Sequence, residues 1–500
     1  MEPYSGSLID LVVDNFDGSE HEMIMLFRPE GSDETYRVSF DDPTAAPEVG
    51  VSFETLGHPD ASDPDLIHLM TANLVRRHRA ALGASSDSGP VQERVLVLLA
   101  QSDSHRLNLG AACSPTDIDR AWFSTADSVA STYASLSTNQ TEVSGQVVTA
   151  PVELGRLGGS CRLNAWAKRA LAAYPGDSRA FNRHVIVLPA AAACGAAGLA
   201  HITAPGERSR LWINDRYACD VGVLTHELGH SFGMHHAWKG GSPYGDLTDV
   251  MGFPRSQTLN APHRMQMGWT PNRDVAEALE GDYEMQSLDV ETPSTSTHPR
   301  VLQLSDRGRD PLFIAYRTAD GLGRTLHPSV HNHVTVHRQH PGRRTELLAT
   351  LAAGETYDDR GPGGISIRLL STRRGLAHVR ISGGHDVSTD GNIQARMLSF
   401  SKRRANGWVV DEDSPTTPIV VEIWYDDLRY TQIVANLPYA GWRRHFPAGA
   451  DSDHRFNLRL PRAPYNEDTI SIWALDVDSS GAPTGERVLL DSIHVTPRGG

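Results

Sequence analysis

The chain has little of several features that define common classes of protein. It has 4 cysteines and only three lysines among its 46 basic residues: Lys168, Lys239 and Lys402. The formal net charge is −15, which argues against nucleic acid as the main partner, because phosphate binding requires a basic surface. The chain lacks any apolar run long enough to span a bilayer, so we expect no membrane span.

The first residues lack a basic segment followed by an apolar one, so no signal peptide is visible. The cysteines nevertheless all fall in one stretch: Cys113, Cys161, Cys194 and Cys219. An even number confined to one region favours two disulfides in an oxidising compartment, with three pairings open. Four buried thiols are the alternative. We expect an extracellular or cell-surface protein, although the chain shows no export signal.

The most informative stretch runs from His226 to His236 and reads HExxHxxGxxH. On a helix, His226 and His230 share a face and can bind one Zn²⁺. Gly233 can adopt positive φ, end the helix and turn the chain so that His236 becomes the third ligand. Three protein ligands leave a fourth position for water, which is typical of a catalytic zinc.

Glu227 is the expected catalytic residue. It can act as general base toward the zinc-bound water and then as general acid toward the leaving amine. We expect the helix to begin after Asp220 as its N-cap and to bury an apolar stripe over 221–232. His235 is expected to be exposed or to lie beside the ligands. A helix with incidental surface histidines is the alternative reading.

Further motifs follow the histidines. Residues 246–252 read DxxDVMG, with Met251 as the candidate for a methionine turn, and residues 260–262 read NAP before a Gly-Trp pair at 268–269. The chain here resembles the metzincin metallopeptidases, and within them the gametolysin (peptidase M11) family. That resemblance implies an α+β catalytic domain, with a twisted sheet, a zinc helix and an irregular lower subdomain.

The resemblance also has departures. Gametolysin is usually described with Gln at the first zinc ligand, whereas His226 follows the common metzincin form. Phe253 stands where some metzincins carry a tyrosine donor. Tyr244 and His263 are the two alternatives for a donor to the oxyanion. One catalytic Zn²⁺ is expected, and a structural Ca²⁺ is left open.

Four units are expected along the chain. Residues 1–90 form a β-rich, propeptide-like unit, and 91–280 form the catalytic domain. Residues 281–385 form a second β-rich unit, and 391–500 resemble the Ig-like β-sandwiches appended to bacterial surface enzymes. The last unit could contact cell wall or glycans through three tryptophans, for which core packing is the alternative: Trp408, Trp424 and Trp442.

Local patterns give more detailed expectations. In the first unit, strands at 7–13 and 22–28 flank Asp17-Gly18, a third strand covers 35–40, and a helix runs over 62–83. In the catalytic domain, helices are expected around 115–135 and 162–174. Buried strands are expected at 95–99, 185–188 and 211–213. The resemblance to metzincins implies that the last is an edge strand that borders the cleft and pairs with an extended substrate. His333 and His337 are expected on a strand surface.

The sequence therefore predicts a zinc-dependent metalloendopeptidase that hydrolyses protein or peptide substrates. One alternative is a non-catalytic adhesin on a metzincin scaffold, and another is a zinc amidase acting on cell-wall peptides. The N-terminal unit could be inhibitory if one of its acidic residues reached the zinc, but no single residue stands out.

Overall fold

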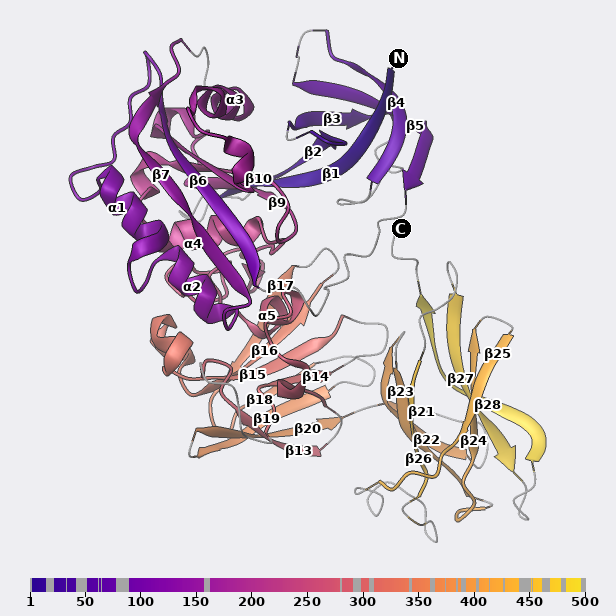
Figure 1. The fold of residues 1–500 in the computed structure, drawn as a ribbon. Helices are drawn as coiled ribbons and strands as arrows, with labels where there is room; N and C mark the ends of the chain where they lie inside the picture. The colour runs from indigo at the N-terminus through magenta and orange to yellow at the C-terminus, as the bar shows by residue number, and fades with distance from the viewer. Residues whose placement is uncertain are drawn as a thin grey trace.

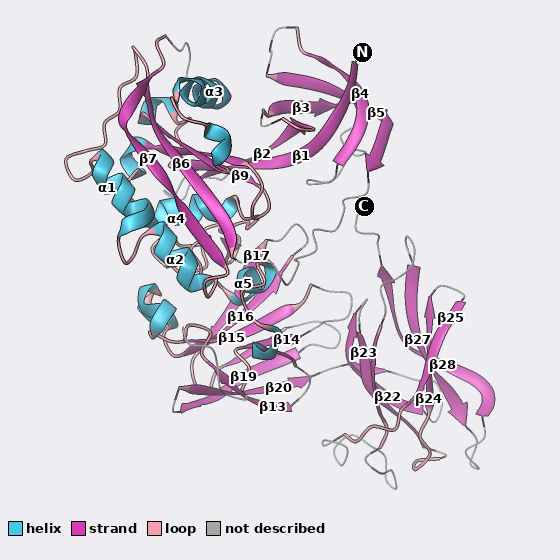
Figure 2. Ribbon diagram, viewed as in Figure 1, coloured by secondary structure: helices cyan, strands magenta, loops and turns pink. Residues whose placement is uncertain are grey.

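The protein is β-rich, with several sheets and few helices (Figures 1 and 2). It is described from a computed structural model. The description covers residues 2–495 except 15–21, 33, 42–51, 62, 64, 78–89, 157–161, 279–280, 291–297, 305–309, 341–343, 360–364, 374, 384, 388–392, 402–403, 413, 426–427, 440–450, 452, 461–467 and 478–482. Within these ranges, no helix is both long enough and apolar enough to cross a membrane.

The first sheet has ten strands in the order β2-β3-β5-β4-β1-β9-β10-β8-β6-β7. Its N-terminal half consists of β1 (Glu2–Asp14), β2 (Glu22–Pro29), β3 (Tyr36–Phe40), β4 (Ser52–Pro59) and β5 (Leu66–Arg77). Its other half consists of β6 (Val91–Gln101), β7 (Thr141–Glu153), β8 (Arg183–Leu188), β9 (Gly198–Ile202) and β10 (Ser209–Asn214). The halves join where β1 pairs antiparallel with β9, so the two expected N-terminal units share one sheet.

Helices cover both faces of the second half of this sheet. On one face, α4 (Val221–His230) and α2 (Val129–Leu136) share a core with the side chains of Val95, Val97 and Leu99. On the other face, α3 (Leu163–Ala173) packs on Leu96 and Leu98 through Trp166. Burial on both faces explains why these strands are almost continuously apolar. Two short helices complete the set: α1 (Pro115–Asp119) and α5 (Ala261–Gln266).

Two sheets share a core after the zinc motif. One has six strands: β11 (Ala237–Trp238), β17 (Thr345–Leu351), β16 (His333–Gln339), β15 (Leu312–Arg317), β14 (Val301–Leu304) and β12 (Val275–Glu277). The other has four: β13 (Gly281–Gln286), β20 (Leu376–Gly383), β19 (Ile365–Arg373) and β18 (Thr356–Asp358). Because β11 and β12 come from before residue 281, the six-stranded sheet contains strands from both sides of the domain boundary expected at residues 280–281.

The remaining chain forms two four-stranded sheets around one common core. The first contains β21 (His385–Val387), β22 (Ile393–Ser401), β23 (Arg404–Asp411) and β26 (Arg455–Arg459). The second contains β25 (Leu428–Val434), β24 (Val420–Tyr425), β27 (Asp468–Val477) and β28 (Pro483–Val495). Trp408 is buried against Val410 and Tyr439, as core packing requires, whereas Trp424 is only partly buried. Trp442 lies outside the described residues.

Two local expectations are wrong. The helix expected over 62–83 is strand β5 as far as residue 77, and the rest lies outside the described residues. Ile67 and Leu69 are buried with period two, and pairing with β3 and β4 overrides the helical spacing of the leucines. Strand 211–213 is not an edge, because β10 lies between β8 and β9. The strands at 7–13, 22–28, 35–40, 95–99 and 185–188 are confirmed, and the Asp17-Gly18 turn lies outside the described residues.

Candidate metal centre

The helix α4 positions the first two histidines of the motif. Asp220 caps its N-terminus, accepting hydrogen bonds from the backbone amides of Gly222 at 3.0 Å and Val223 at 3.2 Å. Leu224 and Leu228 anchor the opposite face in the core of the sheet. The helix ends at His230, and Gly233 has φ +89°, as the motif predicted. The chain therefore turns back immediately after the helix.

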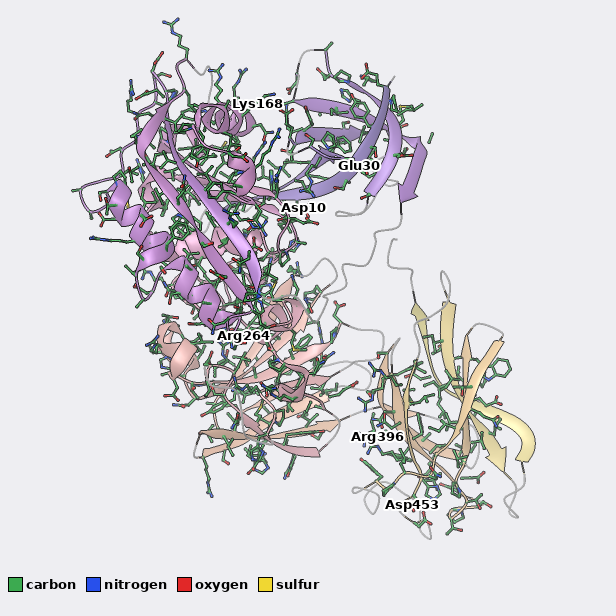
Figure 3. The ribbon with its side chains drawn as sticks, viewed as in Figure 1. Asp10, Glu30, Lys168, Arg264, Arg396 and Asp453 are labelled. Atoms are coloured by element: carbon green, nitrogen blue, oxygen red, sulfur yellow. A yellow bond between two sulfur atoms is a disulfide. The ribbon has the colours of Figure 1, made fainter. Side chains whose placement is uncertain are left out.

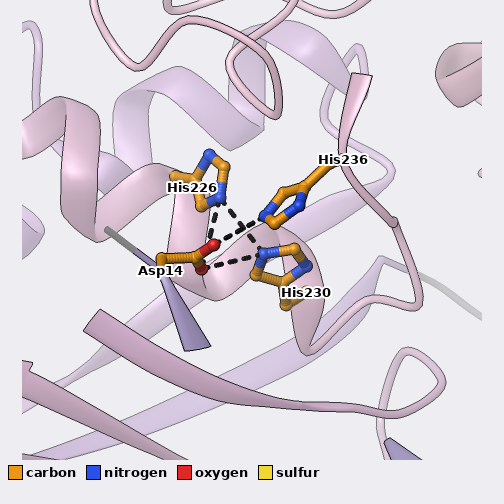
Figure 4. A group of neighbouring side chains, drawn as sticks. All are labelled: Asp14, His226, His230 and His236. Atoms are coloured by element: carbon orange, nitrogen blue, oxygen red, sulfur yellow. Dashed lines mark hydrogen bonds and ion pairs between the residues drawn. The ribbon is translucent and has the colours of Figure 1, made fainter. Parts of the chain in front are cut away.

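That turn brings His236 to the other two histidines (Figure 4). The Nε2 atoms of His226 and His230 are 3.1 Å apart, and the ring of His236 lies 5.3 Å from that of His226 and 4.9 Å from that of His230, centroid to centroid. All three side chains are buried. His235 is partly exposed, as expected, and does not belong to the group.

Backbone carbonyls fix which nitrogen of each helical histidine faces the centre. The Nδ1 of His226 donates to the carbonyl of Val250 at 2.8 Å, and the Nδ1 of His230 donates to that of Met234 at 2.8 Å. Because a carbonyl only accepts, each proton resides on Nδ1, and each Nε2 presents a lone pair to the centre. This is the arrangement that imidazoles adopt as metal ligands.

A fourth residue, Asp14, lies among the three histidines. Its Oδ1 is 2.6 Å from the Nε2 of His236, and its Oδ2 is 3.2 Å from that of His230 and 3.4 Å from that of His226. The hydroxyl of Tyr244 donates to the same Oδ1 at 2.7 Å. Asp14 is the last residue of β1 and is fully buried. The carboxylate comes from the N-terminal unit, as the inhibitory hypothesis required, but from a residue that the sequence did not single out.

The donor set fits a small transition-metal ion. Two nitrogens bound tetrahedrally at about 2.0–2.1 Å lie about 3.3 Å apart, close to the observed 3.1 Å between His226 and His230. One ligand atom from each histidine and one from Asp14 all lie within 4.8 Å of one another. Imidazole and carboxylate suit zinc and related divalent ions. The residues could therefore hold one metal ion.

Burial and charge set the protonation of these groups in the protein without metal. Burial alone would raise the pKa of Asp14, but the three histidines together lower it well below its usual value. Burial lowers the pKa of His236 to about 3 and also lowers that of His230. Burial, reinforced by the negative charge of Asp14, raises the pKa of Glu227 well above its usual value.

Glu227 is fully buried, and among the described residues neither of its carboxylate oxygens has a hydrogen-bond partner. Gly198, the first residue of β9, lies directly against it. A Cβ on Gly198 would stand 2.1 Å from Glu227 Oε1, so only glycine leaves room for the carboxylate. Gly198 also pairs with Asp14 across β1 and β9. Neither Gly198 nor its role was predicted, because nothing local marks this glycine.

Met251 lies beneath the helix, where the resemblance to metzincins places a methionine. A Cβ on Gly229 would stand 2.5 Å from the sulfur of Met251, so the glycine of the motif allows this close contact. Asp249 fixes the turn by accepting from the amides of Met251 at 2.7 Å and Asn260 at 2.8 Å. The same carboxylate binds His263 Nδ1 at 2.8 Å. His263 thus supports the turn, and of the two donors considered, Tyr244 is the one at the centre.

His337 is not a surface residue, contrary to expectation. It is buried, and its Nε2 contacts the carboxylate of Asp246 at 2.9 Å. Asp246 also accepts from the amide of Thr248 at 2.8 Å, from its hydroxyl at 2.7 Å and from Asn260 Nδ2 at 3.1 Å. The strand face that carries His337 is covered by the loop before Met251, which the alternation of the strand cannot reveal. This network ties β16 to the metal centre.

A disulfide joins Cys113 to Cys219, immediately before the cap of α4. Cys194 is also disulfide-bonded, and Cys161 lies outside the described residues. The expectation of disulfides, rather than four thiols, is therefore confirmed for the described cysteines. The Cys113–Cys219 bond ties the segment before α1 to the start of α4.

Three converging histidines, with a buried glutamate beside them and Met251 below the helix, form a group that could hold a metal ion. Residues 145–343 match the family model described as Gametolysin peptidase M11, so the resemblance read from the motifs is confirmed. The chain is also 33% identical over 95 residues to Autolysin of Chlamydomonas reinhardtii. That match spans 17% of this chain and only 15% of the length of that relative. No solved structure matches the chain.

Proposed function

We propose that the protein is a zinc-dependent endopeptidase with a metzincin-like catalytic domain. The observation that carries the proposal is the set of three imidazoles whose Nε2 atoms converge while backbone carbonyls hold two of the Nδ1 atoms, next to a buried carboxylate. The match to a peptidase family supports the same reading. Proteins or peptides are the proposed substrates.

His226, His230 and His236 would hold the zinc. When bound, zinc supplies a Lewis acid that lowers the pKa of water to about 7 and polarises a carbonyl. Glu227 takes the proton of the attacking water and passes it to the leaving amine. The Tyr244 hydroxyl, which now donates to Asp14 Oδ1, donates instead to the oxygen of the scissile carbonyl as negative charge develops on it.

An oxidising compartment is part of the proposal. The disulfide between Cys113 and Cys219 supports an extracellular or cell-surface location, because such bonds persist where glutathione does not reduce them.

A second candidate function has one observation in its favour. With Asp14, four protein side chains surround the centre, and four-coordinate sites are typical of structural zinc. On that reading, the protein is a non-catalytic binding protein. The buried Glu227 counts against it, because a structural site has no use for an additional carboxylate that forms no hydrogen bond with the described residues.

One experiment separates the two candidates. Zinc content and cleavage of a peptide library are measured for the full chain carrying Asp14→Ala, with Asp14→Ala/Glu227→Gln as the control. We expect one zinc per chain in both proteins. Peptide cleavage should be at least about 10³-fold faster with Glu227 than with the Glu227→Gln control, because the glutamine cannot accept a proton. Stoichiometric zinc without cleavage in either protein would refute the peptidase.

A further inference from the structure

The strand β1 lies between β4 and β9 in the ten-stranded sheet, and its last residue reaches the metal centre. Its residues from Asp10 to Asp14 pair antiparallel with β9, from Ile202 to Gly198, and the amide of Ala197 donates to the carbonyl of Asp14 at 2.8 Å. The strands β6 to β10 form the half of the sheet that carries the proposed catalytic domain, called the catalytic half below. Without β1, β9 would be the edge strand of this half. An extended peptide that adds to this edge would use the same backbone groups.

The alternation of β1 decides which of its side chains reach the metal centre. Leu11 and Val13 pack into the core beneath α3, on the face away from the histidines. Asp14 pairs with Gly198, whose missing Cβ points at Glu227, so this residue pair faces α4. The strand therefore delivers its final carboxylate onto the three histidines, and a shift of one residue would turn it away.

The contacts of Asp14 match the requirements of a metal ligand. The carboxylate is fully buried and lies within 3.4 Å of all three Nε2 atoms. A buried carboxylate held against three imidazole lone pairs is favourable only if a proton or a cation lies between them. Four such donors would fill the four positions of a tetrahedral zinc site, so that no position would remain for water or a substrate carbonyl.

We propose that Asp14 is the fourth metal ligand of the intact chain and that β1, which carries it, keeps the peptidase latent. The latency rests on the proposed function, whereas the ligand role stands apart from it. The block lies at the metal position itself, so removal of the Asp14 carboxylate uncovers that position, and departure of β1 from β9 additionally uncovers the peptide-binding edge. The hydroxyl of Tyr244, which donates to Asp14 in the latent state, becomes available to substrate at the same time.

The strand is part of a folded unit rather than a loose tail. Leu11, Val13 and Leu26 share a core with Trp166 and Trp212 of the catalytic half. Lys168 on α3 pairs with Glu34 at 2.7 Å, and Asn164 donates to the carbonyl of Thr35 at 2.9 Å. Deleting residues 1–90 would expose this core, so a point substitution at Asp14 is the cleaner test.

The test uses Asp14→Asn, which preserves the shape of the side chain but removes its charge, together with Asp14→Ala. The control is Asp10→Asn, a carboxylate on the same strand and the same face, at the position where β1 enters the catalytic half (Figure 3). Metal binding is measured in full chains that also carry Glu227→Gln, so that self-cleavage cannot interfere. The readouts are the Zn²⁺ dissociation constant by chelator competition and the visible spectrum of the Co²⁺-loaded protein.

We expect both Asp14 variants to bind Zn²⁺ at least tenfold more weakly and to alter the Co²⁺ spectrum, because the coordination changes. With Glu227 intact, the same variants should cleave a quenched-fluorescence peptide at least tenfold faster than the wild-type chain. Asp10→Asn should change neither metal readout and should not raise the cleavage rate. Circular dichroism checks that each variant folds. If Asp14→Ala does not fold, the comparison is made with Asp14→Asn alone.

The outcomes separate this proposal from the peptidase itself. Unchanged metal affinity and spectrum in Asp14→Asn would overturn the ligand role. Altered metal binding with equal cleavage by wild type and variant would overturn the latency and leave the peptidase intact. Altered metal binding with no cleavage by any variant would overturn the peptidase, and the latency with it, while establishing Asp14 as a ligand.

Discussion

Gly198 offers a quantitative test of how Glu227 is placed. A Cβ at this position would lie 2.1 Å from Glu227 Oε1 and 2.3 Å from its Cδ, whereas real Cβ atoms keep at least 3.0 Å. Replacement by alanine must therefore displace the carboxylate by about 1 Å, and a misplacement of this size costs about 10²-fold in rate. That factor corresponds to about 2.7 kcal/mol in the activation free energy.

The assay compares Gly198→Ala with its parent, both carrying Asp14→Ala so that the metal position is open. We expect kcat to fall about 100-fold, with zinc content unchanged, because the atoms nearest to the added Cβ belong to Glu227 and not to the histidines. The matched control is Gly407→Ala in the C-terminal sheets, where a Cβ would crowd the carbonyl of Arg396 at 2.6 Å. It should lower stability and leave kcat unchanged. A kcat for Gly198→Ala within threefold of the parent, at full zinc content, would refute this placement of the base.

Three further predictions concern the Tyr244 hydroxyl, the buried carboxyl of Asp10 and the Asp246–His337 pair. In the Asp14→Ala background, Tyr244→Phe should lower kcat by about 10²–10³-fold with little change in zinc content, and an unchanged kcat would exclude the hydroxyl as a donor. Burial raises the pKa of Asp10 to about 6 from 3.8, so the folded protein loses stability as the pH rises through this window. Asp10→Asn should therefore stabilise the protein by about 3 kcal/mol at pH 7 and hardly at all below pH 4. Thermal unfolding at both pH values tests this, and an equal gain at both would contradict it. Asp246→Ala should lower the free energy of unfolding by about 3–5 kcal/mol, because this carboxylate accepts four hydrogen bonds. His337→Ala should lower it by about 1–3 kcal/mol, because the imidazole supplies one of those four. Denaturant unfolding measures both, and a larger loss for His337→Ala would contradict this account.

The parts of the centre that the sequence predicted are those encoded within a few residues of one another. His226 and His230 share a helix face, and Gly233 turns the chain, because local geometry dictates both. The cap at Asp220 and the methionine below the helix follow from nearby motifs in the same way. In each case the spacing along the chain determines the spacing in space.

The parts that could not be predicted depend on pairing between distant segments. Asp14 reaches the histidines only because β1 pairs with β9 in one register, and no residue near Asp14 encodes that register. Asp14 follows an apolar run that any buried strand could contain, so a metal ligand at this position has no local signature. Similarly, the alternation around His337 identifies a strand face but not the Asp246 loop that covers it.

The prediction of a helix over 62–83 was wrong for a different reason, which the segment 66–77 shows. Its leucines at 66, 69 and 74 fit a helical stripe, while Ile67 and Leu69 also fit a strand. Short apolar runs of this kind are ambiguous in period, and the pairing of β5 with β3 and β4 decides between the two.

The order in which the chain is made gives the β1–β9 pairing one more consequence. Asp14 precedes His236 by 222 residues, so during synthesis β1 emerges long before the last histidine, and β9 emerges before the metal-binding helix. The cost of closing so long a loop grows only slowly with its length. We therefore expect the Asp14 carboxylate to be synthesised, and free to pair through β1 with β9, before the three imidazoles converge. If Asp14 is a metal ligand, we therefore expect a nascent chain to bring it to the centre together with the last histidine, and not after it.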